Sequence, residues 1–143
     1  MVKRVTKHDC KDELNSINLR ATPARMALMN FFEIADKPLD VQTLVEYLEE
    51  KEIKTDPATV FRIVNMFTEK GLLKQIQLNE GKFRYELSSL KDHHHFICDT
   101  CGTLDDISDC NIGNLEKEIK SKKGFLVKRH SLEFFGLCKN CQK

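Results

Sequence analysis

The chain has 143 residues, of which 41% are hydrophobic and 31% are charged, and its formal net charge is +1. This length suits one domain or two small ones, and a unit of ~60 residues is marginal without a staple such as a bound metal. Neither a run of the ~18 apolar residues that a membrane span needs nor an apolar signal peptide occurs, so we expect a soluble, cytoplasmic protein. Few glycines and prolines and no internal repeat exclude the collagen-like, repeat and disordered classes.

Charge is unevenly distributed along the chain. Residues 1–32 carry six Lys or Arg against three Asp or Glu, residues 33–52 carry two against seven, and residues 53–90 carry six against four. A nearly neutral protein can therefore still present a basic face if its acids are held on another face. This distribution permits a nucleic-acid partner without demanding one.

The first half predicts three short helices. One covers about residues 23–36 after the capping residue Thr22, and a proline at its first position fits that start. A second follows the cap Asp40, where apolar residues recur at helical spacing. A third covers about residues 57–70 after the cap Asp56 and ends at a glycine.

Two strands are predicted next, over residues 72–78 and 82–87, around an Asn-Glu-Gly turn. Three helices followed by a β-hairpin are typical of a winged helix-turn-helix domain, which is a DNA-binding fold.

The third predicted helix has a face suited to DNA. Because successive helical residues rotate by ~100°, Ala58, Arg62 and Asn65 lie opposite the apolar stripe of this helix, with Phe61 at the flank. Arg62 can reach a guanine edge or a phosphate, and Asn65 can pair with adenine. Ala58 and Phe61 can touch thymine methyl groups. The alternatives are an ordinary solvated helix face and a Phe61 side chain that belongs to the core.

The second half has weaker apolar periodicity. Short strands are expected around residues 96–98, 103–107 and 126–135, and one helix around residues 112–122. A unit of this size needs something besides an apolar core to hold it together.

Paired cysteines supply that staple. Cys98-Asp-Thr-Cys101 and Cys138-Lys-Asn-Cys141 are two CxxC turns, and together they predict a four-thiolate zinc site. Two disulfides are disfavoured by the expected reducing compartment, and a thioredoxin-like redox pair would need a single CxxC. Cys10 and Cys110 stay outside this scheme, and we expect small buried or idle thiols there.

A histidine run at residues 92–95 forms a second cluster. In a strand, His93 and His95 share one face and can bind the same ion, while Glu86 and Asp106 offer oxygen ligands. Mixed nitrogen and oxygen ligation suits iron, manganese or zinc without choosing among them. The residues left for the opposite face are Asp92, His94 and, from further along the chain, His130.

The chain resembles the ferric uptake regulator (Fur) family. The matching stretches are LRATPAR (19–25), DPATVFRIVNMFTEKGLL (56–73), EGKFRYEL (80–87), DHHHFICDTCG (92–102) and HSLEFFGLCKNC (130–141). The resemblance implies an α+β protein: a winged-helix DNA-binding domain (1–88) and a small α/β dimerisation domain with a four-cysteine zinc site (89–143). It also implies a metal-responsive repressor, not an enzyme, that binds palindromic DNA operators as a homodimer.

Site residues follow from the resemblance by position. It implies structural zinc ligands at Cys98, Cys101, Cys138 and Cys141. It implies regulatory-metal ligands at Glu86, His93, His95 and Asp106, and parts of an additional metal site at Asp92, His94 and His130. Positions that contact DNA in the family fall at Arg20, Phe61 and Arg62. Iron is the favoured regulatory metal, with manganese or zinc as alternatives.

Some positions depart from the family pattern. A histidine of the sensing site is replaced within residues 37–39 (Lys-Pro-Leu), so the ion would be held by four residues, by water, or by His8 or Cys10. The usual tyrosine before the recognition arginine is Phe61, and the glutamate of the additional site falls at Gly113.

Two further departures concern which signal is sensed. Leu87-Ser88 stands where zinc-sensing relatives often carry a cysteine, whereas Asp106, in place of the commoner glutamate, is a feature of peroxide-sensing relatives. Peroxide- and zinc-sensing members of the family therefore stay as alternatives. Outside the family, a metalloenzyme and a zinc-containing protein-interaction module are the other readings, and no HExxH spacing supports the first.

Overall fold

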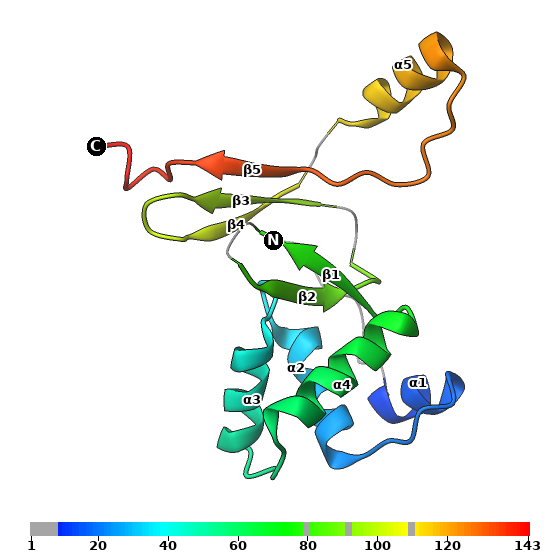
Figure 1. Ribbon diagram of the computed structural model, residues 1–143, viewed down its shortest axis with the longest axis vertical. Helices are drawn as coiled ribbons and strands as arrows, with labels where there is room; N and C mark the ends of the chain where they lie inside the picture. The colour runs from blue at the N-terminus through cyan, green and yellow to red at the C-terminus, as the bar shows by residue number, and fades with distance from the viewer. Residues whose placement is uncertain (1–8, 79–80, 91–92, 109–110) are drawn as a thin grey trace. The chain divides into compact units, whose positions relative to one another are not determined.

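A computed structural model describes residues 9–78, 81–90, 93–108 and 111–143. These residues form two compact units, one that ends at Leu90 and one whose described part begins at His93 (Figure 1). Among them, no helix combines the length and the apolar character needed to cross a membrane.

The N-terminal unit contains helices α1 (Cys10–Ser16), α2 (Pro23–Ile34), α3 (Val41–Glu50) and α4 (Pro57–Glu69), then strands β1 (Leu73–Gln77) and β2 (Phe83–Leu87). The last three helices and both strands confirm the predictions. Helix α1 was not predicted, because it is only seven residues long and mostly polar. Its start is fixed by Asp9, whose side chain accepts a hydrogen bond from the Lys11 amide at 3.0 Å.

Side-chain caps begin the three predicted helices where the sequence placed them. Thr22 accepts from the amide of Arg25 at 3.4 Å, and Asp40 accepts from the amide of Thr43 at 2.8 Å. Asp56 caps α4 in the same way, through the amide of the third residue of that helix. Each cap satisfies an N–H group that has no partner inside its helix.

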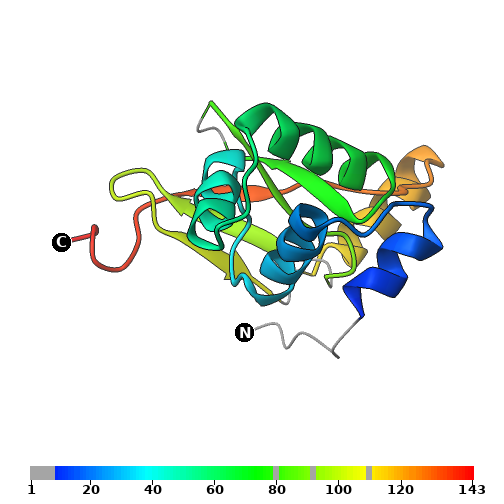
Figure 2. The same ribbon diagram turned by 90° about the horizontal axis from the view of Figure 1, so that it is seen from below.

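These elements pack as a winged helix-turn-helix domain. Helix α2 contacts α1, α3 and β2, while α4 contacts α3 and β1 (Figures 1 and 2). Leu39 and Tyr85 exchange two backbone hydrogen bonds (2.9 and 2.8 Å), which tie the segment before α3 to the hairpin. The most deeply buried core side chains are Leu14, Leu28, Met29, Phe32, Leu44, Leu48, Val60, Val64, Phe67, Leu73 and Tyr85.

The C-terminal unit contains β3 (His94–Cys98), β4 (Leu104–Ile107), α5 (Gly113–Lys123) and β5 (Glu133–Gly136). Its sheet has the order β4-β3-β5, with β3 antiparallel to β4 and parallel to β5. The predicted strand over residues 126–135 is wrong in its first part. The pairing of β5 with β3 covers only His95–Cys98, and β5 accordingly begins at Glu133.

Candidate metal centres and nucleic-acid interface

The two CxxC turns of the C-terminal unit meet at one end of its sheet. Cys98 ends β3, and the parallel pairing of β3 with β5 brings the segment after β5 beside it. Four Sγ atoms all lie within 4.8 Å of one another, those of Cys98, Cys101, Cys138 and Cys141. The Cys101 and Cys138 Sγ atoms are 3.7 Å apart. This distance matches the separation of about 3.8 Å between two thiolates that bind one tetrahedral zinc ion. All four cysteines are free, so no disulfide joins them.

Hydrogen bonds prepare these thiols to hold a cation. Hydrogen bonds from two backbone amides lower the pKa of Cys98 to about 6. The Cys101 amide has the larger effect, and the Cys138 amide has the next largest. The Cys138 amide donates to Cys98 Sγ at 3.3 Å. The neighbouring thiols, that of Cys138 foremost, raise the pKa of Cys141 to about 12. A fully ionised cluster is thus unfavourable unless a positive charge sits among the sulfur atoms, and the donor set fits zinc.

A second cluster lies on one face of the same sheet. His93 Nε2 and His95 Nε2 are 3.9 and 3.7 Å from Asp106 Oδ1. These separations are too long for hydrogen bonds, but ligands that share one tetrahedral ion are about 3.4 Å apart. Oδ1 of Asp106 is buried and accepts no hydrogen bond from the described residues. A buried acceptor beside two imidazole nitrogens is the chemistry of a cation site.

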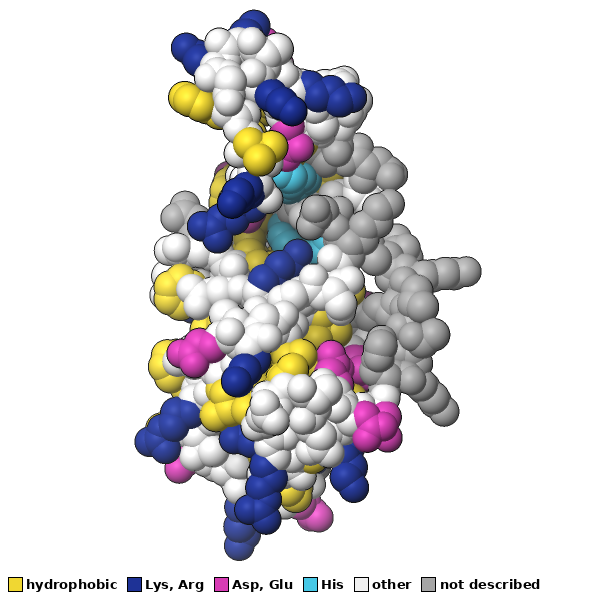
Figure 3. Space-filling model, turned by 90° about the vertical axis from the view of Figure 1, so that its right-hand side faces the viewer, with side chains coloured by type: hydrophobic (Ala, Val, Ile, Leu, Met, Phe, Trp, Pro, Cys, Tyr) yellow, Lys and Arg dark blue, Asp and Glu magenta, His cyan; other side chains and the backbone are white. Residues whose placement is uncertain are grey.

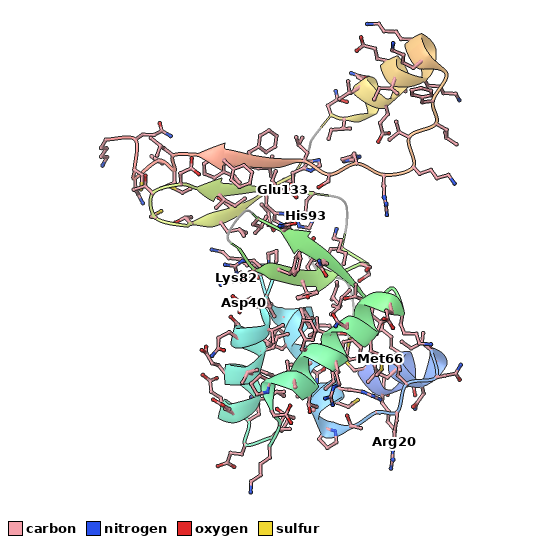
Figure 4. All side chains as sticks on the ribbon, in the orientation of Figure 1. Arg20, Asp40, Met66, Lys82, His93 and Glu133 are labelled. Carbon is pink, nitrogen blue, oxygen red and sulfur yellow. The ribbon has the colours of Figure 1, made fainter. Side chains whose placement is uncertain are left out.

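Strand register explains why His95 and Asp106 meet, and it adds Glu133 to them. His95 pairs with Asp106 on β4 and with Glu133 on β5, so the three side chains share a face of the sheet. Figure 4 labels His93 and Glu133 in this unit. Sequence reasoning did not single out Glu133, because no local pattern shows which residue stands beside His95. Its carboxylate accepts a hydrogen bond from the Ser131 hydroxyl at 3.5 Å.

The remaining predicted ligand of this group, Glu86, belongs to β2 of the N-terminal unit. Its side chain is 5% exposed and forms an ion pair with Lys74, with Nζ and Oε1 separated by 3.1 Å. The two residues face each other directly across the β1–β2 hairpin.

Helix α4 exposes the face that the sequence assigned to DNA. Its buried residues are Val60, Ile63, Val64 and Phe67. Ala58 and Arg62 are exposed and Asn65 is half-buried. The interpretation of Phe61 as a core residue is wrong, since 49% of it is exposed.

Basic side chains accompany this helix within the N-terminal unit. Arg20 is exposed and points away from the helices (Figure 4), while its carbonyl oxygen accepts a hydrogen bond from Arg25 Nη1 at 2.9 Å. Figure 3 shows Lys and Arg side chains gathered at the lower end of this unit. Such a surface suits a phosphate backbone.

A sequence profile of the ferric uptake regulator family matches residues 16–135. The chain belongs to this family. The ferric uptake regulation protein of Bordetella parapertussis is 31% identical over 134 residues, which are 93% of this chain and 96% of that protein. The peroxide operon regulator of Bacillus subtilis is 28% identical over 139 residues, 95% of each chain. A solved structure of the Francisella tularensis ferric uptake regulator with iron is 28% identical and has a TM-score of 0.78, covering 87% of this chain and 96% of that one.

In this ferric uptake regulator family protein, two of the three residues predicted for the additional metal site lie close together. His94 faces away from His93 and His95, and its Nδ1 donates to the Leu132 carbonyl at 3.0 Å. The ring centroids of His94 and His130 are 5.2 Å apart. Asp92, the third predicted member, lies outside the described residues.

Glu116 is a neighbour of this pair that the sequence did not reveal. Its Oε1 lies 3.1 Å from His130 Nδ1. Glu116 follows Gly113, the position of the family glutamate, by one helical turn, and that spacing is the signal that could have found it.

Cys10 does not replace the sensing-site histidine that is missing at residues 37–39. Cys10 is a buried member of the helical core, and its Sγ donates to Asn30 Oδ1 at 3.1 Å. Burial first, and then the carboxylate of Glu33, raise its pKa to about 11. Cys10 is therefore a core thiol, as expected, and not a thiolate ligand; His8 and Cys110 lie outside the described residues.

Proposed function

We propose that this protein is a homodimeric repressor that binds palindromic operator DNA when it holds a divalent regulatory metal. Membership in the ferric uptake regulator family makes the chain a metal-sensing, DNA-binding transcriptional regulator. One observation carries the assignment of the sensor: the buried Oδ1 of Asp106 beside the Nε2 atoms of His93 and His95.

The four cysteines Cys98, Cys101, Cys138 and Cys141 would hold a structural zinc ion. A zinc ion there supplies the charge that lets several thiolates coexist, and it cross-links the end of β3 to the segment after β5. The C-terminal unit needs such a link, because its helix α5 has no buried residue.

The regulatory ion would be held by Glu86, His93, His95 and Asp106, which come from both proposed domains, 1–88 and 89–143. A divalent cation supplies the charge that draws two carboxylates and two imidazoles into one ligand set. Ligands from both domains fix the angle between them, which favours one arrangement for DNA. A coupling of ~1–3 kcal/mol changes operator affinity ~5- to 150-fold.

Ferrous iron is the favoured ion because of the similarity to ferric uptake regulation proteins, one of them solved with iron. The nitrogen and oxygen donors of the set suit iron and equally admit manganese or zinc. The 28% identity to a peroxide operon regulator and the aspartate at position 106 keep iron-based peroxide sensing as the second candidate.

A second copy of the chain would cover the apolar surface of the C-terminal unit. The exposed large apolar side chains there are Ile107, Leu115, Phe125, Leu126, Phe134, Phe135 and Leu137. Strand β5 is also an edge strand of the described sheet. Self-association on such a patch is the usual way for a soluble protein to bury it. A symmetric dimer presents two recognition helices to half-sites about one DNA turn (~34 Å) apart.

DNA would be contacted by Arg20 and by the exposed face of α4, through Ala58, Phe61, Arg62 and Asn65. Arg62 reads a base edge or a phosphate, and Arg20 neutralises phosphate. Because its target is genomic DNA, the protein acts in the cytoplasm, and we assign it no catalytic activity.

The test is metal-dependent DNA binding by the full-length protein. Operators would be selected from a random duplex library with iron- or manganese-loaded protein, and affinity measured with and without metal. We expect His93→Ala with His95→Ala to abolish the metal dependence while leaving a folded, zinc-containing dimer. The matched control is Lys122→Ala, which changes an exposed residue of α5. Unchanged metal dependence in the double variant contradicts the sensing site. A DNA affinity that does not fall as the salt concentration rises would contradict DNA binding. That result would favour a zinc-containing protein-interaction module.

A further inference from the structure

Lys74 and Glu86 form an unequal ion pair. Lys74 on β1 is the direct cross-strand partner of Glu86 on β2, and its Nζ lies 3.1 Å from Glu86 Oε1. The carboxylate side chain is 5% exposed, whereas 36% of the lysine side chain is exposed. One member of the pair is therefore fixed inside the protein, and the other stands at its surface.

The two partners differ in what it costs to separate them. A buried carboxylate is strongly disfavoured without a positive charge, so Glu86 needs a counter-ion in every state of the protein. A lysine ammonium is a compact, strongly hydrated charge on a flexible stem, and it can turn into water at little cost. Lys74 is thus able to leave Glu86 whenever another cation takes its place.

A second lysine of the hairpin shows what a purely structural pairing looks like. Lys82 bonds to Asp40, the cap of α3, whose carboxylate already accepts from Thr43 at 2.8 Å (Figure 4). That pair ties the wing to a helix start. Lys74, by contrast, contacts the one residue of the hairpin that we assign to the regulatory metal.

We propose that Lys74 is the internal counter-ion of Glu86 and must leave this carboxylate before Glu86 binds a divalent cation. Lys74 thereby weakens metal binding and sets the metal concentration at which the protein responds. The inference rests on the proposed function, in which Glu86 is a ligand of the regulatory ion. In the metal-free protein, the same contact keeps the buried carboxylate compensated, so Lys74 also stabilises that state.

The experiment measures metal affinity in full-length, zinc-loaded protein. Mn²⁺ and Co²⁺ are titrated in competition with a chromophoric chelator, which reads binding without DNA. Lys74→Gln should bind either ion about 5- to 20-fold more tightly than the wild type, because no ammonium has to leave. Lys74→Arg keeps the charge and should not tighten binding. The matched control is Lys54→Gln, an equal change of charge at an exposed residue between α3 and α4.

Glu86→Gln separates this inference from the proposed function. If Glu86 is a ligand, Glu86→Gln weakens metal binding at least about 10-fold, and adding Lys74→Gln to it changes nothing further. An affinity unaffected by Glu86→Gln overturns the ligand assignment and, with it, the role of Lys74. Weak binding by Glu86→Gln combined with wild-type or weaker binding by Lys74→Gln overturns the role of Lys74 alone.

A second readout uses the metal-free protein. Both tyrosines of the chain, Tyr47 and Tyr85, lie in the N-terminal unit, so tyrosine fluorescence follows the unfolding of that unit. Lys74→Gln should lower the urea midpoint without metal, and saturating Mn²⁺ should raise it by more than in the wild type. An unchanged midpoint in the metal-free variant contradicts the counter-ion role.

Discussion

Glu116 Oε1 accepts a hydrogen bond from His130 Nδ1 at 3.1 Å, and both side chains are partly exposed. Glu116 stands one turn after Gly113, where the family carries a glutamate of the additional metal site. The acid of this region is therefore displaced along α5, and it engages a ring nitrogen of His130. Nδ1 of His94 donates to the Leu132 carbonyl, which leaves Nε2 as the nitrogen for a metal. Because Gly113 lacks the family carboxylate, we nevertheless expect the additional site to bind metal weakly.

Restoring the family glutamate should therefore create a stronger additional site. Gly113 is the first residue of α5, and a Cβ atom placed there meets no atom within 4 Å. Gly113→Glu should add a third tightly bound metal per chain and raise stability by about 0.5–1 kcal/mol, through helix propensity and the helix dipole. Titration with Co²⁺ and urea unfolding measure the two effects. Gly113→Gln is the control, which should gain most of the stability and no metal.

Local sequence signals predicted the N-terminal unit well. The caps Thr22, Asp40 and Asp56 and the turn between β1 and β2 act over a few residues, so a window of sequence contains their cause. Helix α1 was missed because seven mostly polar residues carry too short a period, although its Leu14 is fully buried in the core. The spacing of the two CxxC turns is an equally local signal, and it predicted the four cysteine ligands.

Strand register, by contrast, could not be read from the sequence. Glu133 stands beside His95, and Lys74 opposite Glu86, only because particular strands pair in particular registers. The contact of Glu116 with His130 likewise depends on where the chain after α5 runs. Such residues modify a site whose main ligands are apparent from spacing, and only coordinates reveal them.

Phe61 offers a test of the DNA face. Its ring is half exposed on α4 at a position where the family carries a tyrosine. Phe61→Tyr should restore a hydroxyl hydrogen bond and tighten operator binding about 2- to 5-fold, since one such bond contributes ~0.5–1 kcal/mol. Phe61→Leu, which offers no hydroxyl, should weaken it. Fluorescence anisotropy with a selected operator measures both, and equal affinities for all three proteins would remove Phe61 from the interface.

The four-cysteine cluster should control the stability of the C-terminal unit alone. Cys98→Ser removes the thiolate with the pKa of about 6, so we expect zinc to fall well below one ion per chain and the dimer to dissociate. Cys10→Ala, in the core of the other unit, should retain zinc while losing about 1 kcal/mol of stability. Elemental analysis and analytical ultracentrifugation measure these outcomes. A zinc-free Cys98→Ser dimer of normal stability would contradict the structural role.

The two carboxylates beside His95 should differ in importance. Asp106 Oδ1 is 3.7 Å from the His95 ring and buried without a hydrogen bond from the described residues, whereas Glu133 accepts from Ser131. Asp106→Asn should weaken regulatory-metal binding about 10- to 100-fold, and Glu133→Gln should change it by less than about threefold. Chelator competition with Mn²⁺ compares them. The reverse order would make Glu133 the ligand.

Asp40 links the wing to α3 and should make stability depend on pH. Burial acts to raise the pKa of Asp40, but the hydrogen bonds from Lys82 and Thr43 outweigh it and lower the pKa to about 2, from 3.8. A carboxylate with a depressed pKa in the folded state stabilises the protein fully above the unfolded value. That contribution is lost as the pH falls through 3.8 towards 2.

Asp40→Asn tests this dependence because asparagine keeps the cap and removes the charge. We expect a loss of about 1–2 kcal/mol at pH 7, which is less than the full pKa shift implies because Lys82 is half exposed. The loss should shrink to about half near pH 3 and to about a sixth near pH 2. Urea unfolding followed by tyrosine fluorescence reports on this unit alone, since both tyrosines belong to it. Lys82→Gln should reproduce the loss at pH 7, and a loss that persisted undiminished at pH 2 would show that the cap, not the charge, had been damaged.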